Sequence, residues 1–80
     1  MSSFNLNTYV IGGPENIQER HLLPSETKSE ALVRFVDIFS SLGLDVFQLR
    51  CKNSSEDDFL KLANEIVQVL KDTNCKLCIN

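Results

Sequence analysis

The sequence predicts an α/β fold built on parallel strands, because three short apolar segments alternate with two amphipathic helices. Residues 7–13, 44–52 and 75–80 are the expected strands, and residues 27–43 and 54–74 are the expected helices. Strands that are joined through helices pair in parallel, with right-handed crossovers. The chain of 80 residues is therefore predicted to form a βαβαβ segment.

The first expected strand, NTYVIGG, is rich in β-branched and aromatic residues and is closed by Gly12, Gly13 and Pro14. This composition is typical of a strand that runs into a loop. The next segment, PENIQERHLLPSE, shows no clear period. We expect it to be an irregular connection, and connections of this length are often functional.

The helix expected over residues 27–43 carries a signal at each end. Thr27 and Glu30 have the spacing of a capping box, and Gly43 stands where a glycine commonly ends a helix. The apolar side chains expected to face the core recur at helical spacing: Leu32, Phe35, Phe39 and Leu42, with Ala31 and Ile38 beside them.

The second expected helix, SSEDDFLKLANEIVQVLKDTN, opens with serines and acidic residues, which suit a cap and the helix dipole. Its expected core residues are Phe59, Leu62, Ala63, Ile66 and Leu70. The last segment, CKLCIN, is the third expected strand.

The middle expected strand contains DVFQLRCKN, in which Gln48, Arg50 and Lys52 share one face and the apolar residues between them share the other. Strands of a parallel sheet are usually apolar on both faces. A face with two cations therefore needs carboxylates, water or a bound anion. Arginine offers phosphate a planar fork, and lysine offers a compact charge. The alternatives are an exposed edge strand, or cations that pair with acidic residues elsewhere.

Glycines or phosphate-binding side chains stand at the carboxyl end of each expected strand: Gly12 and Gly13, then Arg50 and Lys52, then Asn80. Ligands bind at these ends both in barrels and in open α/β sheets. This placement favours an anion site over an exposed edge strand.

The stretch FQLRCKN, followed by an amphipathic helix that contains LA and a strand that ends IN, resembles the N-terminal part of thiamine-phosphate synthase. That family has a Gln-x-Arg-x-Lys strand and, downstream, a hydrophobic strand that ends Asn-Asp. The opening YVIGGPEN is similar to the family's first strand, whereas residues 15–30 match no part of it. Cys51 stands where many relatives have Glu, and the Asp expected to bind metal would follow Asn80.

The resemblance implies a (β/α)8 TIM barrel, of which residues 1–80 would form the N-terminal segment. It implies a transferase of thiamine biosynthesis that condenses hydroxymethylpyrimidine pyrophosphate with thiazole phosphate, uses Mg²⁺ and releases pyrophosphate. It assigns no catalytic residue with certainty and no metal ligand within the chain. The implied substrate-binding residues are Gln48, Arg50, Lys52, Asn80 and Tyr9.

Two other functions remain open. One is a thiazole tautomerase on a similar barrel, although Gln48 together with Lys52 favours the synthase. The other is a non-catalytic phosphate-binding module. Because two helices cannot cover both faces of three parallel strands, we expect the segment to belong to a longer chain and to be inactive alone.

Composition argues against several classes of function and location. The net charge is −3, and the eight Lys and Arg residues are spread along the chain, so a nucleic-acid partner is not expected. No apolar run approaches the roughly 20 residues that cross a bilayer, and no leader peptide is recognisable. Three cysteines do not suggest a disulfide framework, so we expect a cytoplasmic location.

Three further features are expected to have structural roles only. Cys75 and Cys78 have C-x-x-C spacing, but residues three apart in a strand face opposite ways. His21 stands alone in the irregular segment, where a surface position is expected. The acidic residues 56–58 suit the start of a helix.

Overall fold

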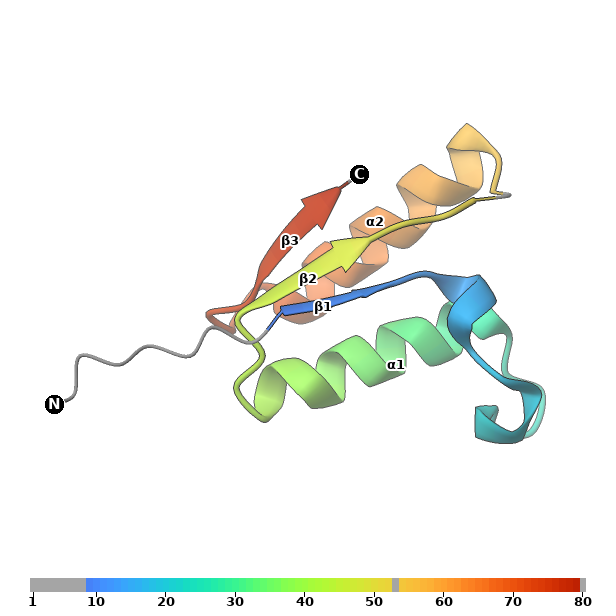
Figure 1. Cartoon of the computed structure of the whole chain (residues 1–80), viewed down its shortest axis with the longest axis horizontal. Coiled ribbons are helices and arrows are strands. Elements are labelled where there is room, and N and C mark those ends of the chain that lie inside the picture. The colour runs from blue at the N-terminus through green and yellow to red at the C-terminus, as the bar shows by residue number, and fades with distance from the viewer. Residues whose placement is uncertain (1–8, 53, 80) are drawn as a thin grey trace, which may run out of the picture.

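One three-stranded parallel sheet and two helices make up the fold (Figure 1). The structure is a computed structural model and describes residues 9–52 and 54–79. The strands lie in the order β1-β2-β3, which confirms the predicted parallel α/β segment. The elements in chain order are β1 (Tyr9–Gly12), η1 (Pro14–Asn16), η2 (Glu19–His21), α1 (Lys28–Ser41), β2 (Val46–Leu49), α2 (Glu56–Leu70) and β3 (Lys76–Ile79).

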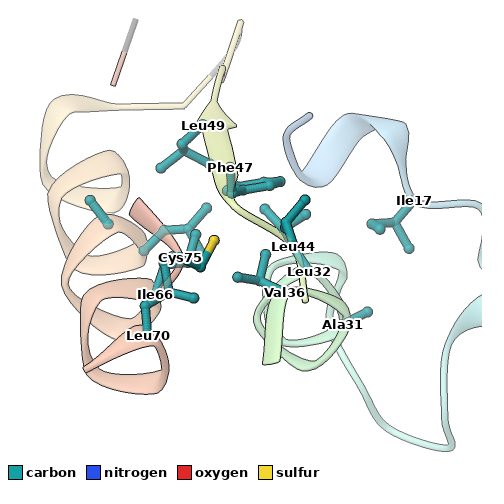
Figure 2. Close-up of a cluster of buried hydrophobic side chains, with 12 residues drawn as sticks. Ile17, Ala31, Leu32, Val36, Leu44, Phe47, Leu49, Ile66, Leu70 and Cys75 are labelled. Carbon is teal, nitrogen blue, oxygen red and sulfur yellow. The ribbon is translucent and has the colours of Figure 1, made fainter. Parts of the chain in front are cut away.

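The hydrophobic core lies between the sheet and the two helices (Figure 2). Phe47 and Leu49 of β2 are 2% and 0% exposed, and both helices contribute buried residues to the same cluster. The remaining core residues are Ile17, Ala31, Leu32, Val36, Leu44, Leu62, Ala63, Ile66, Leu70 and Cys75. Both α1 and α2 pack on the Phe47 side of β2, so no helix within residues 9–52 and 54–79 covers the other face of the sheet.

This second face, called here the open face, consists of two in-register rows of residues, Tyr9–Val46–Lys76 and Ile11–Gln48–Cys78. Tyr9 and Ile11 are 49% and 51% exposed, and Lys76 and Cys78 are also exposed. Parallel sheets are usually covered on both faces. The open face is therefore the surface of the fold on which polar strand residues can meet a ligand.

Side-chain caps lie at the start of each helix, as the sequence predicts. The Thr27 hydroxyl accepts a hydrogen bond from the Glu30 N–H at 3.1 Å, and the Glu30 carboxylate accepts one from the Thr27 N–H at 2.8 Å. Gly43, with φ of +105°, follows the end of α1. The Ser55 hydroxyl accepts from the Asp58 N–H at 3.2 Å. Neither α1 nor α2 is long and apolar enough to span a membrane.

The buried side of α1 differs from the predicted stripe. Phe39 and Leu42 were expected in the core but are 42% and 80% exposed, whereas Val36 and Ser40 are buried. Apolar residues occupy more than half of the circumference of this helix, so periodicity alone does not select one face. The smaller side chains face the sheet, and the Ser40 hydroxyl is satisfied by donating to the Asp37 carbonyl at 2.9 Å.

The connection from β1 to α1 is more ordered than predicted. It contains the short 3-10 helices η1 and η2 instead of irregular chain. A turn follows, in which the Glu26 N–H donates to the Leu23 carbonyl at 3.0 Å. With Pro24 at the second position and Ser25 at a φ of +65°, this is a type II turn.

Hydrogen bonds from Arg34 of α1 hold this connection against the helix. Its Nε and Nη2 atoms each donate to the Glu26 carboxylate at 2.9 Å, and Nη2 also donates to the His21 carbonyl at 2.9 Å. The Leu23 N–H donates to the same carboxylate. The hydrogen bonds from Arg34, followed by the one from Leu23, lower the pKa of Glu26 from its ordinary 4.5 to about 2.

We predict that this carboxylate makes the stability of the fold depend on acidity. Because the folded pKa of Glu26 is lowered, its contribution is fully present above about pH 4.5 and is lost as the pH falls through about 2. Glu26→Gln should therefore lower the free energy of unfolding at neutral pH and lose that difference toward pH 2. Urea denaturation across this range measures the effect. Glu19→Gln, at an exposed residue of η2, should show the same free energy of unfolding as the unmodified chain at each pH. If the free energy of unfolding of Glu26→Gln instead stayed below that of the unmodified chain by a constant amount at every pH, the Glu26 carboxylate would not be the cause.

Candidate anion-binding site

The carboxyl ends of β1 and β2 lie side by side, and two cations follow directly from β2. The Arg50 N–H donates to the Gly12 carbonyl at 3.0 Å, which continues the pairing one residue past the strand. Arg50 and Lys52 are both exposed. Both were predicted to lie within the strand, but β2 is shorter than expected and ends at Leu49, so Arg50 follows it directly and Lys52 stands three residues beyond its end.

Arg50 and Lys52 line one hollow of about 260 Å³ at these strand ends. The side of the hollow opposite β2 is formed by η1. In the described ranges, the Arg50 and Lys52 side chains form no ion pair, so both charges are available to a ligand. The residues that line the hollow are Ile11, Gly12, Glu15, Asn16, Arg50 and Lys52.

Two larger hollows suit an anion less well. One, of about 310 Å³, lies between the first turns of α1 and α2 and combines Lys61 with three carboxylates, those of Glu30, Asp58 and Glu65. The other, of about 480 Å³, lies by the loops that lead into β2 and β3 and is lined by Asp45 and Asp72 without a cation. The hollow beside Arg50 and Lys52 has two cations against one carboxylate, so it is the candidate site.

The turn that follows β1 packs tightly on the end of β2. A Cβ atom on Gly13 would lie 2.0 Å from the Arg50 carbonyl oxygen, which is far inside van der Waals contact. The turn is closed by Asn16, whose side-chain carbonyl accepts from the Gly13 N–H at 2.8 Å and whose own N–H donates to the Gly13 carbonyl at 3.0 Å. Only glycine fits at position 13 in this geometry.

Gln48 and Tyr9 meet on the open face, next to the cations along β2. The Gln48 Nε2 atom donates to the Tyr9 hydroxyl at 2.9 Å. Gln48 is half-buried and Tyr9 is 49% exposed. This hydrogen bond orients the Gln48 amide and leaves its carbonyl oxygen and the Tyr9 hydroxyl hydrogen for other partners.

The cysteines do not add a reactive group to the site. Burial raises the pKa of the Cys51 thiol, and the negative charge of Glu15 raises it further, so the thiol is protonated at neutral pH. Cys75 is buried in the core, and burial also raises its pKa, whereas Cys78 lies exposed on the open face. The C-x-x-C pair is thus separated by the sheet, as predicted.

Asn80, the fifth predicted site residue, lies outside the described residues. Of the other four, Arg50 and Lys52 line the hollow, whereas Tyr9 and Gln48 do not, and Tyr9 lies at the opposite end of β1. Sequence reasoning missed Glu15 and Asn16, which also line the hollow. The signal available was their position directly after the glycines that close the first strand.

The described residues do not fit a preformed site for the Mg²⁺ that the resemblance implies. Residues 9–52 and 54–79 contain no group of three or more His, Cys, Asp or Glu side chains that could hold a metal ion. Glu15 supplies one carboxylate to the hollow. The hollow offers a ligand two exposed cations, Arg50 and Lys52, beside that carboxylate.

We predict that the Tyr9–Gln48 hydrogen bond orients the amide without supporting the fold. Tyr9→Phe should lower the free energy of unfolding by no more than about 0.5–1 kcal/mol, because the bond exchanges with water at a half-exposed position. Urea denaturation of this variant measures the change. A loss above about 2 kcal/mol would instead indicate a buried network, since such losses belong to polar groups left unsatisfied in the interior.

Comparisons with protein-family models, curated proteins and solved structures give no match.

Proposed function

We propose that the chain binds pyrophosphate through Arg50 and Lys52, as the N-terminal part of a TIM-barrel thiamine-phosphate synthase. The observation that carries this proposal is that Arg50 and Lys52 line one hollow at the carboxyl ends of adjacent parallel strands and, within residues 9–52 and 54–79, form no ion pair. Arginine can hold two phosphate oxygens at once, and lysine adds a second positive charge. A diphosphate, with charge on two adjacent phosphorus centres, matches two neighbouring cations better than a single carboxylate does.

The winding of the chain is compatible with a barrel. In a (β/α)8 barrel, consecutive strands are neighbours and every helix lies on the outer face. The order β1-β2-β3 with α1 and α2 on one face has this pattern, but one half of an open doubly wound sheet has it as well. The preference for the barrel therefore comes from the resemblance. The open face would then line the barrel interior, with the hollow at its mouth.

The same residues suit the proposed reaction. As the carbon–oxygen bond of the pyrimidine-methyl pyrophosphate breaks, the bonding electron pair leaves with pyrophosphate, and negative charge grows on its oxygens. The positive charges of Arg50 and Lys52 would stabilise that charge more in the transition state than in the substrate. The carbon left electron-deficient is then attacked by the lone pair of the thiazole nitrogen, which forms the new carbon–nitrogen bond.

The remaining parts of the proposal come from the resemblance. Mg²⁺ is expected from the family, and no step above uses it, because the described residues do not form its site. Tyr9 and Gln48 would border the pyrimidine, and Asn80 would lie beside the pyrophosphate. A cytoplasmic location also remains a prediction. A thiazole tautomerase or a phosphate-binding module without catalysis would use the same two cations.

We predict that the chain binds inorganic pyrophosphate weakly and mainly through Arg50. A dissociation constant on the order of 1 mM is expected for a solvated site with two cations. Arg50→Ala should weaken binding by about tenfold or more, since charge-assisted hydrogen bonds contribute roughly 1.5–3 kcal/mol each. Lys52→Ala should weaken it less. Isothermal titration calorimetry at low salt measures both constants.

Matched variants control for the loss of charge. Arg20→Ala removes an exposed arginine in η2, and Lys76→Ala removes an exposed lysine at the opposite end of the sheet. Both should bind pyrophosphate as the unmodified chain does. If all four substitutions weakened pyrophosphate binding equally, the effect would come from the general loss of positive charge, and the proposed site would be wrong. Circular dichroism confirms that each variant is folded.

A separate experiment distinguishes the synthase from a phosphate-binding module. Hydroxymethylpyrimidine pyrophosphate should bind more tightly than inorganic pyrophosphate if Tyr9 and Gln48 contact its ring. The 80 residues alone should make no thiamine phosphate from it. Equal affinity for the two ligands would favour the module, and measurable turnover would contradict the expectation that further strand–helix units are needed.

A further inference from the structure

We infer that Gly13 is a positioning residue for anion binding: it lets the turn after β1 press against the backbone of Arg50 and so fixes the direction of the cation pair. The inference deepens the proposed function and rests on pyrophosphate binding at Arg50 and Lys52. Gly13 is not among the residues that line the hollow, so its effect has to pass through a neighbour.

The contact between Gly13 and Arg50 is made by backbone on both sides. A Cβ atom at position 13 would lie 2.0 Å from the Arg50 carbonyl oxygen and 3.1 Å from its carbon. Neither atom belongs to a flexible side chain that could move aside. A methyl group at this position would therefore displace the main chain at Arg50, directly between the end of β2 and Lys52.

The turn itself cannot easily move away from β2. On one side, Asn16 closes it with hydrogen bonds of 2.8 and 3.0 Å to the Gly13 N–H and carbonyl. On the other side, Ile17 is 8% exposed and belongs to the core cluster, and η1 packs against α1. The strain of a Cβ would therefore fall on the Arg50 backbone, where the Arg50 N–H is held by the Gly12 carbonyl.

A direct role of Gly13 in holding the anion is excluded by its hydrogen bonds. Glycine backbone N–H groups often bind phosphate in loops that follow a strand. Here the Gly13 N–H already donates to the Asn16 side chain. Gly13 can therefore act only through its close contact with the Arg50 backbone, by which the turn after β1 holds Arg50 in place.

A double-mutant cycle tests this inference with inorganic pyrophosphate as the probe. Gly13→Ala should weaken binding by about fivefold to tenfold in the unmodified chain but by less than about twofold in the Arg50→Ala chain, because residues that act through one another are not additive. A loss of stability alone would give the same fold-change in both backgrounds. Additive effects, or unchanged affinity in Gly13→Ala, would overturn the inference.

Gly43→Ala is the matched control. Gly43 has a φ of +105°, so alanine is strained there and should destabilise the fold, yet it lies at the far end of α1 from the hollow. This variant should lower the melting temperature while leaving the affinity of the folded protein unchanged. A comparable loss of affinity in Gly43→Ala would assign the Gly13 effect to stability.

A second variant covers the case in which Gly13→Ala does not fold. Asn16→Ala removes the 2.8 Å bond that closes the turn and adds no atom beside Arg50. It should show the same non-additivity with Arg50→Ala, and additivity would again overturn the inference. The proposed function fails separately: if the unmodified chain does not bind pyrophosphate, or binds it equally in Arg50→Ala, the site itself is wrong.

Discussion

The burial of Phe47 and Leu49 between two helices is the constraint on which the rest of the structure depends. Both side chains lie on one face of β2, so α1 and α2 must pack on that same face to cover them. Strand residues alternate, and Gln48 is therefore directed to the open face. The position of the candidate site is thus a consequence of where the largest core residues lie.

Local signals in the sequence predicted the elements well because their causes are local. The capping box of α1, the serine cap of α2, the glycine after α1 and the stripe of α2 each depend on residues within a few positions of one another. The buried face of α1 was predicted wrongly because several faces of that helix are apolar, and the choice depends on how closely the helix approaches the sheet. The Glu26–Arg34 pair joins a residue just before α1 to one eight positions later within it, and no short motif encodes it.

The candidate site likewise has a part that the sequence predicts and a part that only the structure shows. Strand alternation predicted Gln48 on the open face, and the rule that ligands bind at the carboxyl ends of parallel strands pointed to Arg50 and Lys52, which line one hollow without Gln48. The opposite side of the hollow comes from η1, whose approach to β2 depends on the absence of a Cβ at Gly13. Hydrophobic periodicity does not encode a contact between two backbone segments, so the contact between Gly13 and Arg50 could be identified only from the structure.

Solvent access sets the strength of anion binding at this site. Arg50 and Lys52 are exposed, so water screens their charges and each contact with an anion is weak. An element that covered the open face would exclude water from the hollow and strengthen these contacts, because the interaction of charges grows as the local dielectric constant falls. It would also bury Tyr9 and Ile11, which are half exposed on the open face. The same cover would therefore stabilise the sheet and raise the affinity of the site.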